Sequence, residues 1–139
     1  MREILFRGKQ EYKNGEWVFG SLHNEYGETD RNGERKIDHR ILGMRGECDY
    51  VIPETVGQFT GLTDKNGKRI FEGDIVIDPY VGAGVVSFGT GTFDSGIYRY
   101  IGWHIKDKDG DVDHRELYRY DFDYEIIGNI HDNPELLEV

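Results

Sequence analysis

The chain has 139 residues, of which 37% are hydrophobic and 13% aromatic, so it can bury a core and is not expected to be disordered. The formal net charge is −10, and residues 77–139 carry 5 basic and 13 acidic side chains, a net of −8. That charge repels phosphate backbones, and no apolar run is long enough for a signal peptide or a membrane span. We therefore expect a cytoplasmic protein that binds neither nucleic acid directly nor membranes.

The first part of the chain is predicted to form a β lobe over residues 1–50. Asn14 and Gly15 make a strong hairpin-turn dipeptide, and Trp17 and Phe19 would share one face of the strand that follows. Residues 31–46 are polar and only weakly patterned, and we interpret them as a long irregular loop.

Strand-like patterns then recur about every 8–12 residues, the spacing of a small barrel. The expected strands are Gly73–Ile77, Val85–Phe88, Ile101–Ile105 and Tyr118–Ile126, with a further turn at Asn66-Gly67. Glycine turns between short strands predict a barrel over residues 54–139. Asn133-Pro134-Glu135 predicts a short helical turn near the C-terminus. The predicted fold is mostly β, with two small lobes.

One acidic stretch, Asp107–Asp113, has the alternating carboxylates of a calcium loop. An EF-hand loop requires Gly at its sixth position and Glu at its twelfth, and those positions hold Val112 and Tyr118. We therefore interpret the stretch as a charged hairpin turn at Asp109-Gly110. Residues 64–67 fail the same test, because no further oxygen ligands follow them, and we interpret them as a turn.

The histidines and the single cysteine do not form a recognisable site either. The five histidines, which are His23, His39, His104, His114 and His131, do not have the spacing of zinc ligands. Cys48 lies between Glu47 and Asp49, whose charges disfavour a reactive thiolate. We therefore expect no catalytic residue, no cofactor and no metal.

Four segments of the sequence are more distinctive than the patterns described above. They are Arg2–Gly8, Asn14–Gly20, Glu54–Val76 and Ile126–Leu137. In this order, over nearly the whole chain, they resemble the YopX-like family of phage and prophage proteins. The resemblance implies a β-rich fold with an SH3-like barrel in its C-terminal part, and it brings no catalytic residue. The shared positions, which we interpret as structural, are Trp17, Gly20, Gly57, Phe59, Gly61, Asn66, Gly67, Gly73, Asp74, Gly128 and Asn129.

Three kinds of function remain open. The first, which we favour, is a phage- or prophage-encoded interaction or assembly module without catalysis, acting in the bacterial host on itself or on a host or phage protein. Residues 82–100 carry only Asp94 and Arg99 as charges and form a poorly protected strand edge, so we expect a homo-oligomer. The second is an enzyme that uses His104 or His114 with nearby carboxylates. The third is an acidic decoy of a host nucleic-acid-binding protein.

Overall fold

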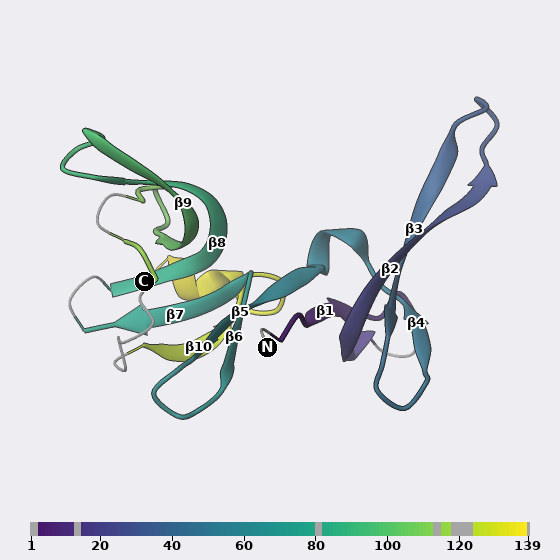
Figure 1. The fold of residues 1–139 in the computed structure, drawn as a ribbon, viewed down its shortest axis with the longest axis horizontal. Coiled ribbons are helices and arrows are strands. Elements are labelled where there is room, and N and C mark those ends of the chain that lie inside the picture. Colours follow the sequence, from purple (N-terminus) through teal and green to yellow (C-terminus); the bar gives the residue numbers. More distant parts are fainter. Residues whose placement is uncertain (1–2, 13–14, 80–81, 113–114, 118–123, 139) are drawn as a thin grey trace. The chain divides into compact units, whose positions relative to one another are not determined.

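The computed structural model describes residues 3–12, 15–79, 82–112, 115–117 and 124–138 (Figure 1). The chain divides into two compact units, Met1–Phe59 and Thr60–Val139. We expected the division at residues 50–54, before β5 (Gly57–Thr63), whereas it falls inside this strand. The start of β5 pairs with a strand of the first unit, which places it there. Antiparallel strands dominate both units, which confirms the mostly-β fold class.

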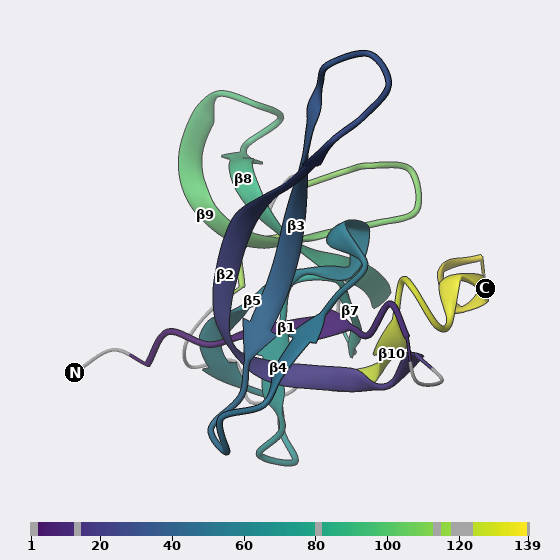
Figure 2. The same cartoon turned by 90° about the vertical axis from the view of Figure 1, so that its right-hand side faces the viewer.

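The first unit is an antiparallel sheet in which β2 and β3 form a long twisted hairpin (Figure 2). Its strands are β1 (Phe6–Lys9), β2 (Trp17–Thr29), β3 (Arg35–Leu42), β4 (Cys48–Tyr50) and the start of β5, in the hydrogen-bonded order β4-β3-β2-β1-β5. The irregular loop predicted for residues 31–46 is therefore wrong over β3. Half of the residues of this strand are solvent-exposed and only Ile41 is buried, so its side chains lack the apolar alternation that marks a strand, and pairing with β2 determines its conformation.

The edge of β4 that does not face β3 is hydrogen-bonded to the segment that follows β1. The Glu11 amide donates to the Tyr50 carbonyl at 3.0 Å, and the Ile52 amide donates to the Lys9 carbonyl at 2.9 Å. Two apolar residues of the paired segments, Ile41 in β3 and Val51 just after β4, are fully buried. A 3-10 turn, η2 (Pro53–Thr55), leads from here to β5.

The second unit contains a four-stranded antiparallel sheet and a hairpin of β5 with β6 (Arg69–Phe71). The sheet has the order β10-β7-β8-β9, formed by β7 (Asp74–Asp78), β8 (Gly82–Phe93), β9 (Tyr98–Lys106) and β10 (Glu125–Asn129). Its core cluster comprises Ile70, Val76, Val86, Ile105, Leu117 and Tyr124. Of the strand expected at residues 118–126, the part from 118 to 123 lies outside the described residues.

The predicted C-terminal helical turn is present as a 3-10 turn, η3 (Pro134–Leu137). Closure of the second unit into an SH3-like barrel stays a prediction, because the strand order of its sheet among the described residues is open. Among all the described residues of the chain, no helix has the length and apolar character needed to cross a membrane.

Candidate functional site

The β8–β9 hairpin carries the apolar face of the second unit beyond its core. Val86 pairs with Ile105, and Phe88 pairs with Trp103, so these side chains lie on one face of the hairpin together with Ile101. Val86 and Ile105 are only 0% and 2% exposed, whereas Phe88 and Ile101 are 56% and 79% exposed. The ring of Phe88 packs edge-on against Trp103, with 5.0 Å between the centroids. The face of the hairpin that is buried in the core at Val86 and Ile105 is therefore solvent-exposed at Phe88 and Ile101.

The end of the same hairpin is apolar as well. Ile97 and Tyr98 are exposed there, next to a turn in which Asp94 and Ser95 have left-handed φ angles of 52° and 56°. We call the exposed apolar residues Phe88 and Ile101, together with Ile97 at the hairpin end, the hairpin patch, whereas Tyr98 lies on the opposite face by strand alternation. Large contiguous patches of exposed apolar surface are commonly sites of association in soluble proteins.

The opposite face of the hairpin holds the histidine that sequence patterns singled out. His104 is 2% exposed, and its ring lies edge-on to that of Tyr100, with 6.5 Å between the centroids. Its Nδ1 atom has no hydrogen-bond partner among the described residues. Burial lowers the pKa of His104, so the ring is neutral near pH 7.

The contacts of His104 with the described residues can be compared with those of a catalytic histidine. A general base works with an orienting group, commonly a carboxylate, and with a nucleophile or substrate within hydrogen-bond reach. Among the described residues, the recorded hydrogen bond of this ring is with the Gly102 backbone, and its Nδ1 atom has no carboxylate partner. His114, the other histidine of that hypothesis, lies outside the described residues.

Burial of a neutral histidine predicts a pH dependence of stability. Because the folded pKa of His104 is lowered, its neutral form stabilises the fold above the unfolded pKa of about 6.5, and this contribution is lost as the pH falls below that value. We expect the free energy of unfolding to fall by at most about 1.4 kcal/mol per pH unit in that window. Urea titrations at several pH values should show this slope in the wild type and in His23→Gln, whose histidine is exposed, and a shallower slope in His104→Gln. Equal slopes in all three proteins would contradict it.

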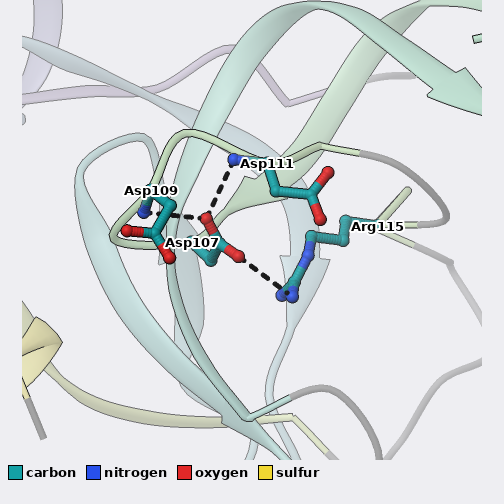
Figure 3. A network of polar contacts seen from close by, with 4 residues as sticks. All are labelled: Asp107, Asp109, Asp111 and Arg115. Atoms are coloured by element: carbon teal, nitrogen blue, oxygen red, sulfur yellow. Dashed lines mark hydrogen bonds and ion pairs between the residues drawn. The ribbon is translucent and has the colours of Figure 1, made fainter. Parts of the chain in front are cut away.

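The acidic stretch after β9 forms a hairpin turn, and Figure 3 shows how its carboxylates are used. Asp107 Oδ1 accepts hydrogen bonds from the amides of Asp109 and Asp111 at 2.9 and 2.8 Å, and Asp107 Oδ2 lies 3.3 Å from Arg115 Nη2. The bond from the Asp111 amide is the largest cause of the lowered pKa of Asp107. Asp107 would be the first ligand of a calcium loop, but its carboxylate is instead bonded to two amides of its own turn and to Arg115.

Among the described residues the same turn occurs three times, beginning at Asp30, Asp64 and Asp107. In each, the aspartate Oδ1 accepts from the amides two and four residues later, and a glycine with a φ near +80° follows three residues after it. The turn at Asp64 alone is tied to a distant strand, because Asp64 Oδ2 also accepts from the Ile126 amide at 3.1 Å. Within the described ranges, no group of three or more His, Cys, Asp or Glu side chains is placed to hold a metal ion.

The family-motif positions of the first unit take part in strand pairing and close packing. Trp17 starts β2 and stacks with Arg7, whose Cζ lies 4.7 Å from the ring centroid. Gly57 pairs with Arg7, and Phe59 is buried. Gly20 has no room for a side chain, because a Cβ there would lie 2.0 Å from the Leu42 carbonyl oxygen.

The motif positions of the second unit lie in turns and strand ends. Gly61 has a φ of +88°, and Asn66 and Gly67 belong to the Asp64 turn. The Gly73 amide donates to the Val86 carbonyl, and the buried Asp74 accepts from the Phe71 amide at 2.7 Å.

The last two motif positions, Gly128 and Asn129, connect β10 to the C-terminal turn. Gly128 follows a bulge in the strand, and a Cβ there would lie 2.6 Å from Asn133 Oδ1. Asn129 Oδ1 accepts from the amides of His131 and Asp132. These contacts give the motif positions of both units a role in the backbone geometry.

Fold and surface together define an all-β protein of two antiparallel units with an exposed apolar hairpin. The chain belongs to the family described as YopX protein, whose model matches residues 5–138. It is similar to the crystal structure of protein EF1440 from Enterococcus faecalis, with 23% sequence identity, 99% of each chain covered and a TM-score of 0.48. No curated protein matches the chain.

Proposed function

We propose that this protein is a non-catalytic interaction module, encoded by a phage or prophage as the family resemblance implies, that self-associates through the hairpin patch. The observation that carries the proposal is the exposure of Phe88 and Ile101, at 56% and 79%, on the same face of the hairpin as the buried Val86 and Ile105. A second copy would cover this face, and apolar area removed from water is the main driving force of such contacts.

The charge distribution favours a second copy as the occupant. The net charge of −10 repels identical chains, but residues 82–105 contain only Asp94 and Arg99 as charged side chains. In a twofold contact the same surface meets itself, so the contact brings together a surface with few charged side chains. The repulsion then comes from acidic groups elsewhere, which salt screens.

Replacing Ile101 by arginine is expected to shift the protein from dimer to monomer without unfolding it. Ile101 is largely exposed, so the change leaves the core intact while it puts a charge into the interface. Burying an unpaired charge at an interface centre commonly weakens association by about tenfold or more. Sizing with light scattering measures the mass, and circular dichroism checks the fold.

The matched control is Met44→Arg, since Met44 is 97% exposed and lies in the other unit. It should keep the wild-type mass. If Ile101→Arg and Met44→Arg shift the mass equally, the hairpin patch is not the interface.

A further inference from the structure

The strand β8 is paired along only part of one of its two edges. On that edge β7 pairs with β8 from Gly82 to Val85, and the Gly73 amide donates to the Val86 carbonyl at 2.9 Å. The other edge pairs with β9 as far as Phe93, the last residue of β8. Among the described residues, no strand pairs with the first edge beyond Val86. We call this edge at residues 88–90 the open edge.

The pairing with β9 determines which backbone groups lie at the open edge. In an antiparallel ladder, residue pairs that exchange hydrogen bonds alternate with pairs whose N–H and C=O groups point away from each other. Trp103, opposite Phe88, points its carbonyl away from β8, because that carbonyl accepts from the Leu117 amide at 3.1 Å. Phe88 and Thr90 therefore point their N–H and C=O groups away from β9, whereas Gly89 between them bonds to β9. Each of these two residues thus offers one donor and one acceptor at the open edge.

The open edge lacks the charged side chains that commonly prevent a strand edge from pairing with another chain. The outer part of the β2–β3 hairpin, residues 25–38, is also open at both edges among the described residues. Its charged residues are Glu25, Glu28, Asp30, Arg31, Glu34, Arg35, Lys36 and Asp38. The outer part of the β8–β9 hairpin, residues 86–101, has only Asp94 and Arg99, and β8 itself contains neither a charged residue nor a proline. The edge of β8 is therefore suited to strand pairing, and the edges of β2 and β3 are not.

We propose that two copies of the protein join by antiparallel pairing of their open edges, with Gly89 of one copy opposite Gly89 of the other. This inference rests on the self-association proposed above and specifies its contact. A twofold axis perpendicular to the sheet at this point relates two identical strands that run in opposite directions. In this register Phe88 exchanges hydrogen bonds with Thr90 of the second copy, and Thr90 with Phe88 of the second copy. The donors and acceptors of both open edges are then all paired.

The same register joins the hairpin patches of the two copies. Within each hairpin Thr90 pairs with Ile101, so these two side chains lie side by side on the face that also carries Phe88. Across the contact, Phe88 therefore lies next to Thr90 of the second copy, which is followed on the same face by Ile101 of the second copy. Because threonine is short, the exposed Phe88 and the second copy's Ile101 flank it and close over it. The backbone contact and the apolar contact thus belong to one interface.

Amide hydrogen exchange resolved by residue tests the pairing, because it distinguishes neighbouring amides of β8. Exchange is followed by NMR in dilute protein and at a concentration at which, by light scattering, about 90% of the chains are associated. In dilute protein the Gly89 amide, bonded to β9, should exchange slowly, and the amides of Phe88 and Thr90 should exchange fast. In the associated protein the exchange of these two edge amides should slow by about tenfold, because only the free chains expose them. The Gly89 amide is the internal reference.

Slower exchange of both edge amides in the associated protein alone supports the proposal. Association with unchanged exchange at Phe88 and Thr90 would overturn edge pairing and leave association through the face of the hairpin standing. The mass of a single chain at every concentration up to tens of micromolar would contradict self-association itself, and edge pairing with it. Slow exchange of the edge amides already in the dilute monomer would also overturn edge pairing, since the chain would then cover its own edge.

Thr90→Pro removes one donor of the open edge. Proline has no N–H, and edge strands accept it where that N–H would face solvent, so the monomer should keep its fold. We expect the Kd of association to rise by about tenfold or more, because each copy loses one hydrogen bond to the other. Thr90→Val, the matched control, keeps the N–H and the β-branched shape and should associate like the wild type. Equal association of the two variants would contradict the proposal, and circular dichroism checks the fold of each.

Discussion

Asp64→Ala is expected to lower the free energy of unfolding of the second unit by about 3 kcal/mol or more, because three amides lose their acceptor at about 1 kcal/mol or more each. Asp64 is 4% exposed and accepts from the amides of Asn66, Lys68 and Ile126. These amides lower its pKa against the opposing effect of burial, so the charged carboxylate is the form that the fold uses. Urea denaturation followed by far-UV circular dichroism measures the loss.

Asp30→Ala is the matched control for Asp64, since it removes the same two turn bonds at an exposed site. There the amides recover water as a partner, and the expected loss is below about 1 kcal/mol. If the two substitutions cost the same, the bond from Ile126 and the burial of Asp64 do not contribute as argued.

Gly20→Ala is expected to destabilise the first unit by about 3 kcal/mol, at the upper end of the usual cost of overpacking. The added Cβ would lie 2.0 Å from the Leu42 carbonyl oxygen, and this obstacle is backbone, which cannot move without disturbing the pairing of β2 with β3. The two tryptophans, Trp17 and Trp103, fall one in each unit. The Trp17 fluorescence of a Trp103→Phe protein therefore reports the unfolding of the first unit.

Gly102→Ala serves as the comparison, because a Cβ at that strand position meets only the Tyr100 ring at 3.7 Å, an ordinary contact. Its stability should stay within about 0.5 kcal/mol of the wild type. A Gly20→Ala protein as stable as Gly102→Ala would show that β3 moves aside at little cost.

Local patterns predicted those parts of the fold that local physics determines. The alternation of Ile75 and Ile77 and of Ile101, Trp103 and Ile105 lies in strands, as expected. The turn at Asn66-Gly67 forms because glycine adopts a positive φ there and the preceding aspartate binds the turn amides. A repeated sequence, Asp-x-Asn/Asp-Gly, would have predicted all three such turns, including the one at Asp30 that helps to define β3.

The rest depends on contacts between residues distant in sequence. β3 carries little apolar alternation, so its strand conformation becomes evident only once β2 lies beside it. Val86 and Phe88 lie on one face and look alike in a periodic pattern, yet one is buried and the other exposed, because periodicity does not show where the core ends. The bridge between Gln10 and Val51 joins segments about forty residues apart, which no local signal reveals.

The mass of the wild-type protein in solution tests self-association most directly. Sedimentation equilibrium or sizing with light scattering, at tens of micromolar protein and in both low and high salt, gives this mass independently of any variant. The proposal predicts at least twice the mass of one chain, with tighter association at high salt, where the repulsion from the net charge of −10 is screened. The mass of a single chain under both conditions would contradict it.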